Sequence, residues 1–178
     1  MTNIIFLFGT FAGLIVIGAM IAVIAASGGN PEMSDHSLFL GYLIMIVALS
    51  MIFFGIKRYR DHELGGVIKF LPALMMGVAI SVVAGIIYVA VWEVYMAATN
   101  HSYINAFITH AIEAEKAKGL TGAALDKMIA EMEAFKVQYA NPLFRLPMTF
   151  LEIFPVGLVI SLISAALLRL PKFLPAKA

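Results

Sequence analysis

The chain of 178 residues contains no cysteine, and only 13% of its residues are charged. Without cysteine, the protein has no disulfide bonds, thiolate metal sites, covalent haem attachment or thiol nucleophile. Its formal net charge of +1 is too small to indicate nucleic-acid binding. Nucleotide-binding glycine motifs, the Gly-x-Ser-x-Gly elbow and the His-Glu-x-x-His motif are also absent. We therefore expect no catalytic residues, no cofactor, no enzyme activity and no nucleic-acid partner.

Apolar residues are abundant instead. They make up 62% of the chain and raise its mean hydropathy to +0.95, whereas soluble domains contain roughly 45 to 50% apolar residues. The charged residues are absent from the first 31 positions and then gather between long apolar runs. This pattern predicts an integral membrane protein.

Four apolar segments are long enough to cross the hydrocarbon core, which takes about 20 helical residues. They cover residues 4–26, 38–56, 70–92 and 148–168. No basic residue precedes the first segment, which is also longer than the roughly 7 to 15 apolar residues of a signal peptide. We therefore predict an all-α, polytopic membrane protein in which residues 1–178 form a single domain with four transmembrane helices.

Basic residues predict the orientation of these helices, because lysine and arginine concentrate on the cytoplasmic side. They follow the second segment and fill the C-terminal tail: Lys57, Arg58, Arg60, Lys69, Arg169, Lys172 and Lys177. Residues 27–37 contain none. We expect a bacterial inner (plasma) membrane protein with both termini in the cytoplasm. Lys57, Arg58 and Arg60 are interpreted as an anchor at lipid headgroups or as a docking site for a cytoplasmic partner.

The loop between the third and fourth segments has apolar residues at helical spacing. Two stripes share this pattern: Tyr103, Phe107, Ile108 and Ala111, and then Leu125, Met128, Ile129, Met132, Phe135 and Tyr139. Gly119 and Thr121 separate the stripes as a C-cap and an N-cap, and Asn141 and Pro142 end the second one. We predict a helical hairpin over about residues 100–140 outside the membrane, folded onto itself or onto the membrane surface.

Small residues recur at intervals of four in three of the segments. These helix-packing candidates are Gly9 and Gly13, then Gly77, Ser81 and Gly85, and finally Gly157, Ser161 and Ala165. Such stripes let helices approach closely in lipid, so they favour an intramolecular four-helix bundle. The alternative is that Gly9 and Gly13 serve self-association or docking to another membrane protein.

The ionisable residues within or beside the segments form a candidate polar cluster. Glu93 and Glu152 are expected at one level of the bilayer, with Arg145 and Tyr88 nearby. The cluster is interpreted either as a protonatable or cation-binding site, or as structural, with Glu93 in water and Glu152 near the positive N-terminus of its helix. We favour the structural interpretation. Glu152 lies opposite the small residues of its helix, so the third segment, the hairpin or a partner must cover it.

His110 and Glu113 are one helical turn apart, and His101 lies nearby in the sequence. No third ligand follows at a fixed spacing. We therefore expect no metal site.

Two stretches of the chain resemble a known family. The first reads FFGIKRYRD over residues 53–61 and continues with Gly65, Gly66 and Phe70. The second reads MTFLEIFPVG over residues 148–157 and SLISA over residues 161–165. In these motifs the chain resembles the small bacterial membrane proteins of domain of unknown function 4199. The resemblance implies a four-span membrane domain and supplies no substrate, cofactor or catalytic residue.

We expect from these observations a non-catalytic membrane protein that acts by association, as an accessory or assembly subunit or as a homo-oligomer. Its partners would be the lipid bilayer and a membrane protein or a second copy of itself. The alternative is a small transporter or ion-coupled component that uses Glu93 and Glu152.

Overall fold

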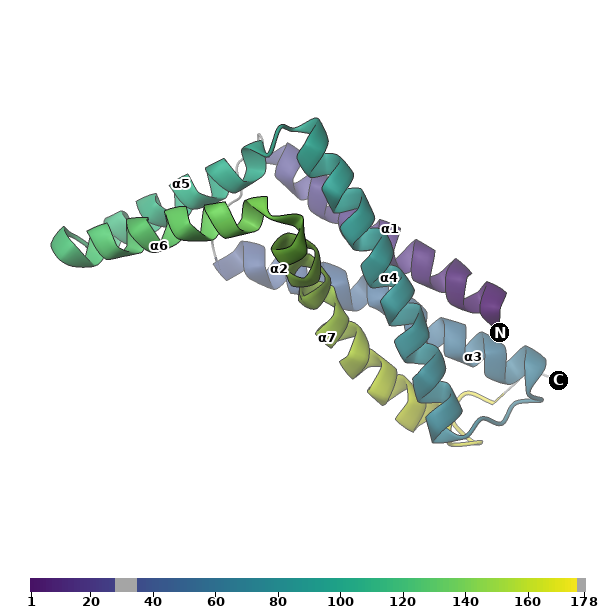
Figure 1. The fold of residues 1–178 in the computed structure, drawn as a ribbon. Helices are drawn as coiled ribbons and strands as arrows, with labels where there is room; N and C mark the ends of the chain where they lie inside the picture. Colours follow the sequence, from purple (N-terminus) through teal and green to yellow (C-terminus); the bar gives the residue numbers. More distant parts are fainter. Residues whose placement is uncertain (28–34, 176–178) are drawn as a thin grey trace.

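The computed structural model describes residues 1–27 and 35–175. Residues 28–34, within the loop that lacks lysine and arginine, and residues 176–178, which include Lys177, lie outside this description. Over the described residues the structure contains helices and no strand (Figure 1). The helices are α1 (Thr2–Ala26), α2 (Asp35–Leu49), α3 (Met51–Glu63), α4 (Phe70–Ala98), α5 (Ser102–Ala117), α6 (Gly122–Ala140) and α7 (Pro142–Leu168).

Four helical segments are long and apolar enough to cross a membrane, which confirms the predicted all-α fold and the number of spans. They are α1, the α2–α3 unit from Phe39 to Glu63, α4 and α7. The boundaries differ from those predicted, because α4 continues to Ala98 and α7 begins at Pro142. Asn141 ends α6 and also caps α7, since its side-chain oxygen accepts a hydrogen bond of 3.0 Å from the Leu143 amide.

Ser50 separates α2 from α3 within the second span. Its hydroxyl donates to the Val47 carbonyl at 2.6 Å, a bond that satisfies a backbone acceptor where the helix is interrupted. Beside this break Leu49 is fully buried, whereas Phe39 and Tyr42 are exposed. Among its described side chains, α2 is therefore buried in the bundle only at its C-terminal end.

Helix α4 is the centre of the bundle, because it packs along both α1 and α7. Its buried residues include Met76, Ile80, Ala84 and Met96. Many large apolar side chains on the outer faces, such as Phe6 of α1, remain exposed. A bilayer covers such faces without further packing, so this exposure fits a membrane protein.

Helices α5 and α6, together called the arm, project from the four long segments (Figure 1). The two helices pack against each other, and Gly119 takes a φ of +92° just after α5. In α5, Ile104 and Ile108 are buried, whereas Tyr139 is the only buried residue of α6. The buried residues of the arm therefore lie in the first part of α5 and at the end of α6, the parts of the arm nearest in sequence to α4 and α7.

Candidate functional site

Glu93 and Arg145 form a bidentate ion pair between α4 and α7. The Arg145 Nε donates to Glu93 Oε1 at 2.7 Å, and Nη2 donates to Oε2 at 2.5 Å. The Arg145 side chain is 6% exposed and that of Glu93 is 28% exposed. Arg145 lies at the end of the first turn of α7 rather than in a loop before it, because the helix begins at Pro142.

The remaining donors of Arg145 hold the end of the arm. Nη1 donates to the carbonyl oxygens of Tyr139 at 3.0 Å and of Ala140 at 3.4 Å. These carbonyls lie at the C-terminus of α6, where the helix leaves acceptors without helical partners and where a cation is favoured. The guanidinium also lies over the Tyr139 ring, with Cζ 5.8 Å from the ring centroid. One side chain thus joins α4, α6 and α7.

Aromatic residues complete this junction. The Trp92 indole nitrogen donates to the Tyr139 hydroxyl at 3.0 Å, and its ring meets the Tyr103 ring edge-on at a centroid distance of 4.9 Å. Burial, together with the negative charge of Glu152, raises the pKa of Tyr103 to about 12. Burial likewise raises the pKa of Tyr139. Both phenols therefore stay protonated at neutral pH and act as hydrogen-bonding groups.

Glu152 lies apart from the ion pair and has a different partner. Its Oε2 accepts a hydrogen bond of 3.1 Å from the Tyr88 hydroxyl, which also lies 3.1 Å from the Met20 sulfur of α1. Tyr88 is only 1% exposed, whereas Glu152 is an exposed residue of the chain. The four predicted cluster residues thus form two pairs, Glu93 with Arg145 and Glu152 with Tyr88.

The position of Glu152 along its helix also differs from the prediction. It follows Pro142 by ten residues, which is about 15 Å of helix, instead of about four residues from the start of the span. A carboxylate three turns into a helix gains little from the N-terminal dipole. The expected stabilisation of Glu152 by its helix N-terminus is therefore wrong, and the Tyr88 hydroxyl is its hydrogen-bond donor.

The small residues lie at helix contacts within the chain. A Cβ atom added to Gly13 would be 2.6 Å from the Ala84 carbonyl oxygen of α4, and one added to Gly9 would be 2.9 Å from the carbonyl oxygen of Ile80. Both distances are shorter than real contacts, so the absence of a side chain lets α1 approach α4 closely. The Gly9 and Gly13 stripe is occupied within one molecule.

The stripes of α4 and α7 face each other. A Cβ atom on Gly77 would meet Ser161 at 2.8 Å, and one on Gly157 would overlap Ser81. Gly85 is covered by the Phe150 ring, while Ala165 is fully buried near the end of α7.

The same face of α4 continues to Tyr88, which reaches Glu152. Glu152 and the small residues lie on different faces of α7, yet α4 contacts both. The small residues of α4 pack directly on those of α7, and the long Tyr88 side chain of α4 reaches around to Glu152.

The three basic residues at the other end of the bundle have separate surroundings. Arg60 is fully buried, and its guanidinium donates to the carbonyl oxygens of Leu168 at 3.4 Å and Phe173 at 3.0 Å. It is therefore unavailable to lipid headgroups, contrary to its interpretation as an anchor. Lys57 is half-buried and pairs with Asp61, and only Arg58 is exposed.

His110 and Glu113 lie on the arm, with Nδ1 and Oε2 4.0 Å apart. In the part of the chain that the structure describes, no group of three or more histidine and carboxylate side chains is arranged to hold a metal ion.

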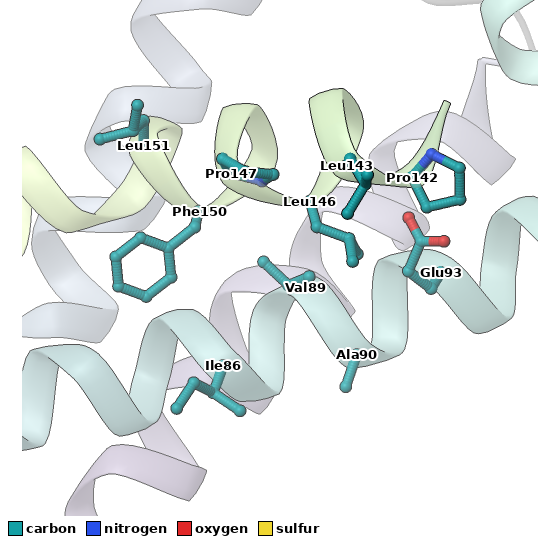
Figure 2. A pocket seen from close by; sticks show the side chains of 10 residues that line it. All are labelled: Ile86, Val89, Ala90, Glu93, Pro142, Leu143, Leu146, Pro147, Phe150 and Leu151. Atoms are coloured by element: carbon teal, nitrogen blue, oxygen red, sulfur yellow. The ribbon is translucent and has the colours of Figure 1, made fainter. Parts of the chain in front are cut away.

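A groove of about 660 Å³ opens between α4 and α7 beside the ion pair (Figure 2). Ile86 and Ala90 line it from α4, while Leu146 and Phe150 line it from α7. Nine of its ten lining residues carry apolar side chains, and Glu93 is the exception. Figure 2 shows Glu93 beside Pro142 at one end of the groove and Phe150 towards the other.

The sequence analysis did not identify Tyr139 and Trp92 as parts of the site. Tyr139 was expected only as the last member of an apolar stripe, and Trp92 only as the last residue of the third apolar segment. The useful signal was that both carry one polar atom on a large ring, which needs a partner when buried. Their pairing follows from the return of α6 to the end of α4.

Four spans, internal small-residue contacts and buried polar groups at helix junctions define a small polytopic α-helical membrane protein. Residues 7–169 match the family described as protein of unknown function (DUF4199). The chain belongs to this family, as its sequence motifs predicted. No curated protein and no solved structure gives a significant match to the chain.

Proposed function

We propose that the protein is a non-catalytic membrane protein that acts by association through its arm. The observation that carries this proposal is the incomplete cover of the apolar stripe of α6. Leu125, Met128, Ile129 and Met132 remain partly exposed although α5 packs against α6. Apolar side chains that remain exposed to water outside the bilayer often mark the binding site of another protein.

The attachment of the arm supports this role. Arg145 joins the end of α6 to α4 and α7, and Trp92 holds Tyr139 by a second hydrogen bond. A surface held in one orientation loses less conformational freedom on binding than a flexible one. Basic residues follow the second span and fill the C-terminal tail, and such residues concentrate on the cytoplasmic side. We therefore propose that the arm lies on the outer face of a bacterial inner membrane and that both termini lie in the cytoplasm. The partner is a membrane-associated protein or a second copy of the chain.

The proposal is tested by replacing one residue of the open stripe. Ile129→Glu should abolish co-purification of the partner, or convert an oligomer to a monomer, in chemical crosslinking and native mass spectrometry of solubilised membranes. The neighbouring exposed residue offers a matched control, so Ala130→Glu should leave the complex intact. A wild-type protein that is strictly monomeric and retains no partner would contradict the proposal.

A second function is favoured by the pair of Glu152 and Tyr88. An ionisable side chain deep within a membrane span is costly and often marks an ion or proton pathway. Glu152 accepts a hydrogen bond from the Tyr88 hydroxyl, and Glu152 is exposed on the outside of the bundle. The alternative is therefore a small transporter or ion-coupled component in which Glu152 binds the proton or ion. Glu93 is the weaker candidate, because both of its carboxylate oxygens accept hydrogen bonds from Arg145.

Proton flux into liposomes containing the purified protein tests this alternative. Glu152→Gln should abolish the flux and Tyr88→Phe should reduce it, whereas Glu133→Gln on the exposed surface of the arm should have no effect. The absence of flux from the wild type under every imposed gradient removes the alternative.

A further inference from the structure

The groove between α4 and α7 is lined almost entirely by apolar side chains, which complement an apolar ligand. Ile86, Ala90, Leu146 and Phe150 present hydrocarbon surface, and both helices are long and apolar enough to span a membrane. The hydrocarbon core holds no water to fill such a space. An apolar chain supplied by the bilayer therefore matches the lining of the groove.

The size of the groove favours one lipid chain over a protein helix. Its volume of about 660 Å³ lies within the roughly 300 to 1,000 Å³ that hold a single small ligand. A helix is about 10 Å wide and needs a long, shallow face instead. The Glu93 end is near the start of α7, so the other end is about 10 Å deeper along α4, at Ile86.

Hydrogen-bond acceptors without matching donors gather at the Glu93 end. A carboxylate has about four acceptor positions, and Arg145 uses two of those on Glu93. Pro147 has no N–H, so the Leu143 carbonyl loses its usual helical partner four residues on. Both groups belong to residues that line the groove. A headgroup that donates several hydrogen bonds, such as a primary ammonium, complements this end.

We propose that the groove binds one acyl chain of a phosphatidylethanolamine molecule, whose ammonium group hydrogen-bonds to Glu93. The acyl chain lies between α4 and α7 towards Phe150. A phosphatidylcholine headgroup carries the same charge but has no N–H to donate, so it is the matched comparison.

Native mass spectrometry of the full chain in detergent tests the proposal with added phosphatidylethanolamine and phosphatidylcholine of identical acyl chains. We expect phosphatidylethanolamine to bind at least about tenfold more tightly. Ala90→Phe fills the groove and should weaken that binding by at least about tenfold, the loss expected when roughly two methylenes no longer fit. Leu146→Phe makes the same test from α7.

Ala22→Phe is the control, because Ala22 is also exposed but lies on α1, away from the groove. It should bind the lipid like the wild type. Unchanged fluorescence of Trp92, the only tryptophan, checks that each variant is folded. Equal binding of the two lipids overturns the role of Glu93, and equal binding by folded Ala90→Phe and Ala22→Phe overturns the groove as the site. A co-purifying protein that Ala90→Phe displaces would identify a protein occupant and overturn the lipid.

Discussion

Two buried arginines hold opposite ends of the bundle in related ways. Arg60 donates to the carbonyls that follow and end α7, and Arg145 donates to the carbonyls that end α6. Each also pairs with a carboxylate, but Asp61 is the neighbour of Arg60 in sequence, whereas Glu93 is 52 residues from Arg145. Arg60 therefore ties α3 to one chain segment, and Arg145 joins three helices.

The difference shows that a basic residue beside a membrane span need not mark the lipid headgroups. Burial removes the hydration of a guanidinium, and several acceptors in fixed positions must replace it. Carbonyls at helix ends supply such acceptors, because they have no partner within their own helix. The arginine at the junction with the arm couples distant elements, and this difference can be tested by mutation.

The largest effect is expected for Arg145→Ala. This change leaves Glu93 without its ion-pair partner and frees the end of α6, so we expect a loss of about 3 kcal/mol in the free energy of unfolding. Trp92 should become more exposed, which would shift its fluorescence to longer wavelength. Thermal unfolding in detergent and the emission spectrum measure both changes. An unshifted spectrum would mean that Arg145 does not hold the arm.

Arg60→Ala should have a smaller and more local effect. Asp61 keeps its pairing with Lys57, and the loss of hydrogen bonds to Leu168 and Phe173 should cost about 2 kcal/mol. Proteolysis of the C-terminal segment should become faster, whereas Trp92 fluorescence should stay unchanged. Arg58→Ala, at an exposed arginine, should change neither quantity. A shift of Trp92 fluorescence in Arg60→Ala would show that the two ends are coupled.

Two glycines of α1 test the bundle between the arginines. Gly13→Ala places a methyl group against the Ala84 carbonyl, so the free energy of unfolding should fall by about 1 to 3 kcal/mol. Gly18→Ala adds its methyl group to open space, and a rise of up to about 1 kcal/mol is expected from helix propensity. Equal effects of the two changes on thermal unfolding would contradict the contact between α1 and α4.

The smallest effect concerns alkaline pH at the junction with the arm. The pKa of Tyr103 is about 12 in the folded protein, above its ordinary value of 10.0, so the unfolded chain loses this proton first. Stability from Tyr103 is therefore fully present below pH 10 and declines as the pH rises towards 12. The decline in melting temperature over this range should be smaller for Tyr103→Phe than for the wild type. Identical slopes would mean that Tyr103 is not buried in the junction.

Sequence patterns predicted the spans because hydropathy and length decide whether a helix can cross a bilayer. They placed the start of α7 too late, since Pro142 and Asn141 were taken only as the end of the preceding helix. Proline at the first position and asparagine at the cap also begin a helix, and here one pair of residues does both. That shift moved Arg145 into the helix and Glu152 deeper along it.

The sequence by itself determined that this is an all-helical membrane protein with four spans, because bilayer thickness acts on each segment independently. Only the tertiary structure decided which partner each polar group has. Glu93 pairs with Arg145, Glu152 accepts from Tyr88, and Arg60 is buried against backbone carbonyls. Such pairings depend on how residues far apart in sequence meet in space, and residue type and local spacing do not contain that information.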